Sequence, residues 1–245
     1  MTLSKDGDSQ VRINKYIADA GIISRRGAET LIIENRVRIN GKLVTSLSEK
    51  VNIENDTVSI DGENISLPGN YVYIMFNKPK GCVVTMKDEK NRKTVMDYID
   101  ITQKRVFPVG RLDYDSEGLL LLTNDGELAY KLTHPAFEVP KTYLVKIEGE
   151  ATGNELAVLR KGAVIDGKQL NRCKIKFKES KDGIFSYEVT INQGYNRQIR
   201  KMFESINKQV VFLKRISVGE LRLGGLGRGK SRFLKDFEIE YLKKL

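Results

Sequence analysis

Residues 110–126 read GRLDYDSEGLLLLTNDG, a polar turn followed at once by an apolar strand. Composition alone explains the polar half as a solvated turn, because Asp and Ser side chains bond nearby backbone groups. Asp113, Asp115 and Glu117 alternate, and alternating side chains of an extended chain point to the same side. Three carboxylates on one side could hold divalent cations, so a metal-dependent nuclease is one alternative for this loop.

Apolar stretches on both sides of the loop predict one α+β domain over residues 70–245. Strands are predicted at 71–76, 82–86, 106–109, 119–122, 143–147, 173–177, 185–191 and 210–216. Helical patterns fall at 94–99, 127–132, 154–160, 196–206 and 234–244. Strict alternation of strand and helix is absent, so we expect a mixed, mostly antiparallel sheet flanked by helices.

A smaller domain is predicted over residues 10–66, in the order helix, helix, hairpin. Residues 13–20 follow helical spacing, Ser24 is a good N-cap for a second helix, and residues 37–44 predict a hairpin. Arg25 and Arg26 fall in the first turn of the second helix, where the helix dipole disfavours cations. A phosphate bound there would explain them, although a solvated charged face is the alternative.

The charge balance points to a polyanionic partner. Among 245 residues, 42 are Lys or Arg and 32 are Asp or Glu, a net charge of +10, and the surplus lies beyond residue 68. Only Cys82, Cys173 and one histidine, His134, are present, so neither a disulfide framework nor a zinc cage is indicated. No apolar run reaches the roughly 20 residues of a membrane span, and the N-terminus lacks a signal-peptide pattern, so we expect a cytoplasmic protein.

Four motifs of the larger domain resemble the RsuA/RluB/RluE/RluF family of ribosomal RNA pseudouridine synthases. They are GRLDYDSEGLLLLTNDG at 110–126, FNKPKG at 76–81, KTYLV at 141–145 and GYNRQIRKMF at 194–203. The smaller domain resembles the S4 RNA-binding domain over RINKYIADAGIISRRGAETLIIENRVRINGK. The last motif and the basic C-terminal stretch look closer to the RluF and RluB types. The resemblance, and not residue spacing, favours RNA chemistry over a nuclease.

The resemblance implies three catalytic residues. Asp113 matches the family's catalytic aspartate, which acts at the C1′ or C6 region of the nucleotide or helps to remove the 2′ hydrogen. Tyr143 matches the active-site tyrosine, and Arg200 matches the cation that pairs with the aspartate. Arg200 lies beside the predicted apolar stripe of its helix, so it can reach inward. Asp115 and Glu117 would then be bystanders or supporting groups.

RNA contacts are expected from a further set of cations. Arg111 resembles the residue that fills the space of an everted base, and Arg197 and Lys201 are placed for phosphates. The other candidates are Arg25, Arg26, Arg36 and Arg38 of the S4-like domain, and Arg228 and Lys230 of a glycine-rich loop, predicted to be flexible, at 224–232. The resemblance implies isomerisation of a uridine in 23S rRNA by a monomer without cofactor, metal or protein partner. The alternatives are 16S rRNA as substrate and a noncatalytic RNA-binding assembly protein.

Overall fold

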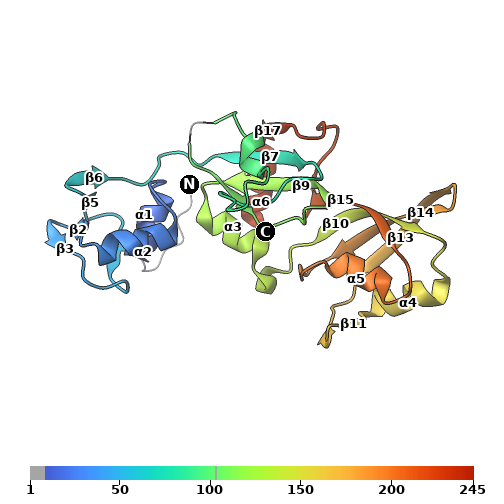
Figure 1. Ribbon diagram of the computed structural model, residues 1–245. Helices are drawn as coiled ribbons and strands as arrows, with labels where there is room; N and C mark the ends of the chain where they lie inside the picture. Colours follow the sequence, from blue (N-terminus) through green and yellow to red (C-terminus); the bar gives the residue numbers. More distant parts are fainter. Residues whose placement is uncertain (1–8, 103) are drawn as a thin grey trace. The chain divides into compact units, whose positions relative to one another are not determined.

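The computed structural model describes residues 9–102 and 104–245 (Figure 1). Its described residues form two compact units, one reaching to Tyr71 and including Lys104–Val106, the other comprising the rest from Val72. The α+β fold class, with a small domain of two helices and short strands before a larger mixed-sheet domain, is confirmed. The predicted domain boundaries at residues 66 and 70 stay predictions.

The first unit packs two helices against short strands around one core. Its elements are β1 (Gln10–Arg12), α1 (Ile13–Asp19), α2 (Arg25–Ile33), β2 (Val37–Ile39), β3 (Lys42–Leu43), β4 (Lys50–Asn52), β5 (Val58–Ile60) and β6 (Glu63–Ile65). The Ser24 hydroxyl accepts the Gly27 N–H at 3.1 Å and caps α2, as predicted. Asn40 and Gly41 both have positive φ, which a type I′ turn requires, so the predicted hairpin is confirmed.

The second unit is built on a nine-stranded mixed sheet, in which η denotes a 3₁₀-helix. Its elements are β7 (Tyr73–Lys78), η1 (Val95–Tyr98), β8 (Phe107–Val109), β9 (Glu117–Thr123), α3 (Gly126–Thr133), η2 (Pro135–Phe137), β10 (Lys141–Glu148), α4 (Gly153–Lys161), β11 (Val164–Ile165), β12 (Lys168–Gln169), β13 (Lys174–Lys181), β14 (Ile184–Ile191), α5 (Gln198–Glu204), β15 (Val210–Val218), β16 (Leu221–Arg222), β17 (Ser231–Phe233) and α6 (Asp236–Lys244). The strand order is β13-β14-β10-β15-β9-β7-β17, with β16 on β15 and β8 on β9.

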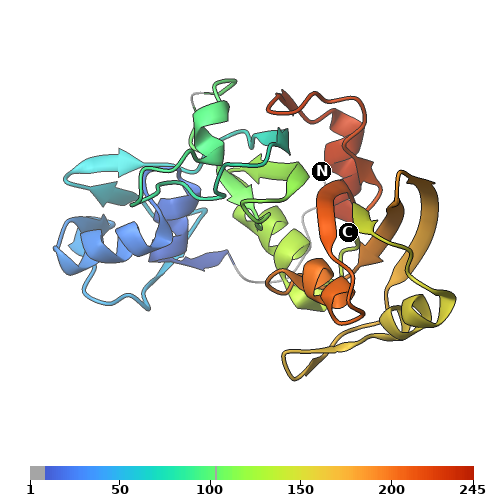
Figure 2. The ribbon, with the colours of Figure 1, turned by 45° about the vertical axis from the view of Figure 1, so that its right-hand side comes forward.

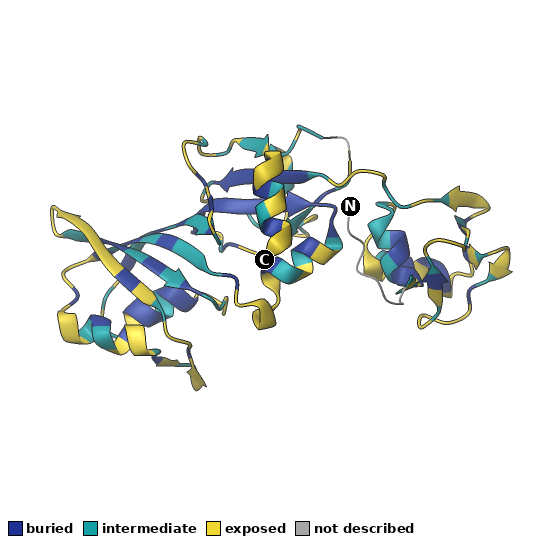
Figure 3. Cartoon of the chain, turned by 180° about the vertical axis from the view of Figure 1, so that it is seen from behind, coloured by how far each residue is buried: buried dark blue, intermediate teal, exposed yellow. Residues whose placement is uncertain are grey.

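Helices cover the sheet at both of its ends. α3 and α6 lie beside the β7–β9 end, and α4 and α5 beside the β13–β14 end (Figure 2). Leu119 and Leu121 of β9 form a core with Leu128, Leu132 and Leu242 of the helices, and all seven residues of β9 are buried (Figure 3). A fully buried strand at the centre of the sheet provides a rigid support for the loop that precedes it.

β9 and β15 are the parallel neighbours in this otherwise antiparallel sheet, and they meet at Gly118. Gly118 has a φ of 107°, and a Cβ on it would lie 2.2 Å from the carbonyl oxygen of Arg215. Any side chain there would force the strands apart. Gly118 therefore allows β15 to lie directly beside the end of the 110–117 loop.

Several predicted elements differ from the structure. Residues 82–86 form no strand, because only Val83 bridges to Thr94 and no neighbouring strand continues the pairing. α5 begins at Gln198, not at 196, because Arg197 has a left-handed backbone with φ 52°. The loop predicted to be flexible at 224–232 is partly ordered as β17, which pairs with β7. Of the helices described, none has the length and apolar composition needed to cross a membrane.

Candidate active site

A buried lysine binds backbone carbonyl oxygens of the loop between β8 and β9. Lys78, at the end of β7, has no exposed surface, and its Nζ donates to the carbonyl oxygens of Asp113 at 2.9 Å, Ser116 at 2.9 Å and Pro79 at 3.1 Å. A protonated amine has three N–H groups, and these three acceptors use all of them. Burial lowers the pKa of Lys78, while nearby carboxylates, Asp113 among them, oppose that shift. Lys78 thus fixes the backbone on which Asp113 stands.

Two arginines of the α5 region hold the same loop from the other side through Asp115. The Arg197 Nη1 lies 3.2 Å from Asp115 Oδ1, and the Arg200 Nη2 lies 3.2 Å from Asp115 Oδ2 and 3.1 Å from the Asp115 carbonyl oxygen. Burial alone would raise the pKa of Asp115, but the two guanidinium groups lower it below its ordinary value. Asp115 is therefore an ionised link between the loop and α5.

The observed partner of Arg200 differs from the predicted one. Arg200 pairs with Asp115 and not with Asp113, and its Nη1 is held at 2.9 Å by the carbonyl oxygen of Val210. These contacts fix the guanidinium with its buried Nε unbonded. Burial lowers the pKa of Arg200, and both Asp115 and Asp113 favour its charged form. These contacts fit the supporting group, one of the two roles that the sequence left open for Asp115. Asp113 is a second counter-charge, without a direct ion pair to Arg200.

Asp113 and Tyr143 line a cavity of about 510 Å³ within the second unit. Tyr143, on β10, is 8 % exposed. No hydrogen bond or ion pair joins the Asp113 carboxylate to another side chain in the described part of the chain. The cavity is also lined by Arg111, Leu112, Ser116, His134, Lys141, Asn171, Tyr195, Arg197 and Arg215. Its volume falls in the range of small-ligand pockets, enough for one nucleotide.

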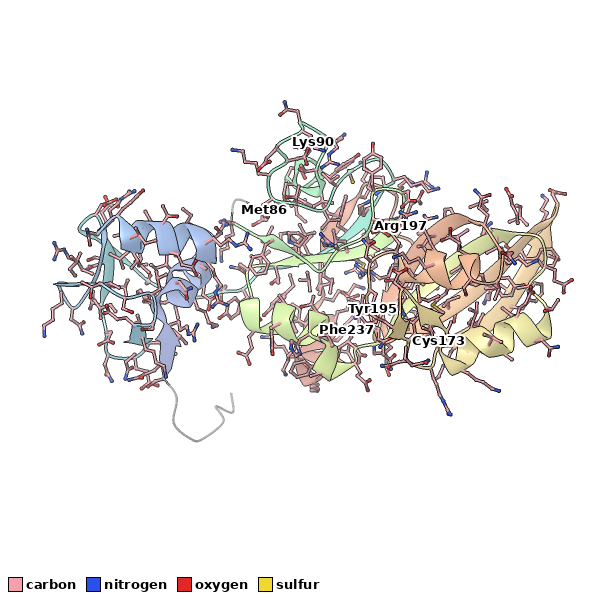
Figure 4. All side chains as sticks on the ribbon, turned by 60° about the horizontal axis from the view of Figure 1, so that its bottom comes forward. Met86, Lys90, Cys173, Tyr195, Arg197 and Phe237 are labelled. Atoms are coloured by element: carbon pink, nitrogen blue, oxygen red, sulfur yellow. The ribbon has the colours of Figure 1, made fainter. Side chains whose placement is uncertain are left out.

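The cavity wall carries positive charge at several depths. Arg215 is 4 % exposed and its Nε donates to the Leu119 carbonyl oxygen at 2.7 Å. Burial, together with the charge of Arg215, lowers the pKa of Lys141 to about 8. Arg111 is exposed, and Arg197 and Tyr195 stand on the loop that leads into α5 (Figure 4). An anionic ligand with a planar part fits such a wall better than a neutral or cationic one.

The three alternating carboxylates do not converge. Asp115 faces the α5 arginines, and Glu117, which is 3 % exposed, pairs at 3.1 Å with Arg228. Within residues 9–102 and 104–245, no group of three or more His, Cys, Asp or Glu side chains is placed to hold a metal ion. The arrangement that the nuclease alternative needs is therefore not formed by these residues.

The remaining predicted RNA-binding cations differ in their surroundings. Arg36 bonds Asp61 and Glu34, Lys201 pairs with Asp166, and Arg228 is engaged by Glu117. Arg38 donates to the Gly41 carbonyl oxygen at 3.2 Å. Arg25, Arg26 and Lys230 are exposed. Only Arg111 and Arg197 of this set line the cavity.

Comparison with known proteins decides the family. Residues 72–205 match the RNA pseudouridylate synthase family, and residues 11–58 match the S4 domain. The chain belongs to the RNA pseudouridylate synthase family. Its matched segment contains the whole 110–126 loop, Tyr143 and α5.

Named relatives of this pseudouridylate synthase cover nearly its full length. It is 41 % identical to the ribosomal large subunit pseudouridine synthase B of Bacillus subtilis, over 96 % of each chain. It is 38 % identical to the dual-specificity RNA pseudouridine synthase RluF of Escherichia coli, over 97 % of this chain and 80 % of the relative. A crystal structure of a pseudouridylate synthase, 31 % identical, superposes with a TM-score of 0.68 over 95 % of this chain and 99 % of the other.

Sequence reasoning undervalued two features of this synthase's site. It assigned Lys78 of the FNKPKG motif no role in the interior, and it left Asp115 open between a bystander and a supporting group. Lys78 directly follows the apolar run YIMFN, and that position at the end of a buried strand is the signal that could have placed it inside. No comparable signal exists for Asp115, because its partners are more than 80 positions away.

Replacing Asp115 by asparagine is expected to lower the free energy of unfolding by about 1–3 kcal/mol at neutral pH, because the largely buried Arg200 loses its paired anion. The lowered pKa of Asp115 sets the pH dependence. Its stabilisation is full above the ordinary carboxyl pKa and is lost as pH falls through the lowered folded value, so the two proteins converge in acid. Urea denaturation across that range measures the difference. Asp166→Asn is the control, because its pair with Lys201 is exposed and should contribute less than about 1 kcal/mol.

Proposed function

We propose that this synthase converts a specific uridine of 23S rRNA into pseudouridine. The observation that carries the proposal is the cavity in which Asp113 and Tyr143 meet the cationic loop of α5, in a chain 41 % identical to a ribosomal large subunit synthase. Arg111 and Arg197 on the cavity wall suit a phosphate backbone entering at its mouth. A site of action in the cytoplasm and a monomeric enzyme belong to the same proposal.

The reaction rearranges one nucleotide without net change in composition. The bond from ribose C1′ to uracil N1 breaks, the base turns while it is held, and a bond from C1′ to C5 forms. The C5 proton then leaves and N1 gains a proton, so atoms and charge balance and no redox partner or ATP is required. The protein must supply a carboxylate at the sugar, retention of the freed base, and a means of everting the nucleotide.

We assign to Asp113 the chemical step at the ribose or the base of the target uridine. Asp113 lines the cavity, and its carboxylate has no ion-pair partner among the described residues, so it is available to act at C1′ or C6, or on the 2′ hydrogen. Lys78 and Arg200 hold the backbone of the loop that carries this carboxylate, through the carbonyl oxygens of Asp113 and Asp115.

We assign Tyr143 to contact with the everted base, and Arg111 to the gap that this base leaves in the RNA stack. The Tyr143 ring, fixed in β10 between β14 and β15, can lie against uracil, and its hydroxyl can assist proton transfer at C5. Arg111 lies two residues before Asp113, so a guanidinium inserted into the stack would leave the carboxylate beside the extruded nucleotide. Eversion costs a few kcal/mol, and stacking of the guanidinium offsets part of it.

The proposal is tested by incubating 23S and 16S transcripts separately with the purified protein, then mapping pseudouridine by carbodiimide-dependent reverse-transcription stops. We expect one stop in 23S rRNA, in the presence or absence of EDTA. Modification of 16S rRNA alone would make 16S rRNA the substrate. Binding without modification of either RNA would favour a noncatalytic assembly protein. Strand cleavage that EDTA abolishes would favour the nuclease.

Removal of residues 1–66 is expected to weaken binding of the 23S substrate by about tenfold or more, because Arg25 and Arg26 are lost with the S4 domain. The sheet of the second unit has its own core and should stay folded. Filter binding measures the affinity, and circular dichroism with a thermal scan reports the fold. Unfolding of the remaining chain would contradict the assignment of two modules.

A further inference from the structure

Three exposed rings form a contiguous cluster at the edge of the cavity. Tyr130 lies on α3, His134 joins α3 to η2, and Phe137 ends η2. The ring centroids of Tyr130 and His134 are 4.7 Å apart, and Phe137 lies 5.9 Å from Tyr130 and 6.3 Å from His134. We name these three residues the rim cluster. His134 and the following Pro135 also line the cavity, so the cluster extends outward from the proposed active site.

The rim cluster is outside the hydrophobic core. α3 buries Leu128 and Leu132, whereas Tyr130 is 55 % exposed and Phe137 is 41 % exposed. Exposed rings contribute little to the stability of the folded protein. Covering them with a ligand would be favourable, because it removes apolar surface from water. Contiguous exposed aromatic rings beside a pocket are typical of a surface that a ligand covers.

The backbone holds the cluster in place before any ligand binds. His134 caps η2, its Nδ1 accepting the Ala136 N–H at 3.3 Å, and Thr133 closes α3 with a hydroxyl that donates to the Ala129 carbonyl oxygen at 2.7 Å. These contacts fix the turn that carries two of the three rings. Because folding already orders this turn, a ligand that binds there loses little further conformational entropy of the protein.

The rim cluster is next to the residue assigned to base replacement. A Cβ on Gly110 would lie 3.4 Å from Cγ2 of Thr133, so the backbone just before Arg111 passes beside the turn that carries His134. When a uridine is everted and Arg111 takes its place, the nucleotide on one side of it loses a stacking partner. Unpaired bases in RNA sites commonly stack on aromatic side chains.

We propose that the rim cluster is a stacking platform for the unpaired nucleotide adjacent to the target uridine. The proposal rests on the proposed function, because it needs an RNA held in the cavity. A base lying on these rings would bury aromatic surface and hold the strand in register with Asp113. It would also make the enzyme favour a site with an unpaired, stackable neighbour, whichever bases it carries.

The test uses the full chain and a 23S rRNA stem-loop around the mapped uridine, with 2-aminopurine placed at either neighbouring position. A stacked 2-aminopurine is quenched, so wild-type protein should quench one of the two probes on binding. Tyr130→Leu and Phe137→Leu keep apolar volume but lose the ring, and we expect them to lose the quenching and to weaken affinity about 5- to 150-fold. Tyr130→Phe and Phe137→Tyr keep a ring and should behave as wild type.

Phe237→Leu is the matched control, because Phe237 (Figure 4) is 66 % exposed at the start of α6. Its ring centroid lies 5.8 Å from the Lys235 amine. It should change neither affinity nor quenching. Equal quenching and affinity in the Leu and aromatic variants would overturn the stacking proposal and assign the rim cluster to another occupant. Pseudouridine formed at saturating RNA by wild-type protein reports the proposed function separately, so failure of the platform and failure of the enzyme give different results.

Discussion

Asp113→Asn is expected to abolish pseudouridine formation, lowering the single-turnover rate by at least about 10³-fold, while RNA affinity changes by less than about threefold. Asparagine has the shape of aspartate but no ionised oxygen to act at C1′ or C6 or on the 2′ hydrogen. The Lys78 bonds reach the backbone carbonyl of residue 113 and not its side chain, so the loop should keep its position. The loss then belongs to the chemical step.

Release of tritium from RNA labelled at uracil C5 measures this rate, because the isomerisation exchanges the C5 hydrogen for a bond to carbon. The Asp115→Asn protein is the informative comparison, since it removes a carboxylate from the same loop but one that is already bound to two arginines. An Asp113→Asn protein that retains more than about a tenth of the wild-type rate would remove Asp113 from the chemistry. Unchanged cellular pseudouridine in a strain that carries only this variant would favour the noncatalytic alternative.

Local signals predicted much of the fold. The Ser24 cap, the Asn40-Gly41 turn and the buried strand after Glu117 each depend on neighbours within a few positions, and each was found where the sequence placed it. The prediction failed where long-range pairing decides. β17 forms because β7 offers its free edge to residues 231–233, and residues 82–86 stay irregular because no strand lies beside them.

The sequence predicted which residues line the candidate site, but not which of their side chains pair with each other. Resemblance to a family selected Asp113, Tyr143 and Arg111, which all line one cavity. Charge pairing depends on the distance between side chains far apart in sequence, so spacing could not show that Arg200 reaches Asp115 rather than Asp113. The burial of Lys78 is only partly visible in the sequence. The run YIMFN places it at the end of a buried strand, but nothing local shows that its amine meets the carbonyl oxygens of the 110–117 loop.

Lys78→Met is expected to lower the single-turnover rate by about 100-fold, with RNA affinity changed only a few-fold. Methionine fills the same buried space but cannot donate to the carbonyl oxygens of Asp113, Ser116 and Pro79. Freed of those bonds, the loop can shift relative to Tyr143, and displacement of a reacting group by about 1 Å can cost two orders of magnitude in rate. Lys80→Met is the control, because Lys80 is exposed two residues later in the same motif and should leave the rate near wild type.

The pH dependence of stability tests whether burial lowers the pKa of Lys78. Burial lowers the folded pKa of Lys78 below its ordinary value of 10.5, so the unfolded chain binds the extra proton between those two values. Wild-type stability therefore gains a contribution as pH rises through that window, and the Met variant lacks it. Urea denaturation at about pH 7 and about pH 10 should show the wild type gaining on the variant at the higher pH. A pH-independent difference would mean that burial does not lower the pKa of Lys78. Wild-type turnover by Lys78→Met would mean that the ammonium does not hold the Asp113 loop.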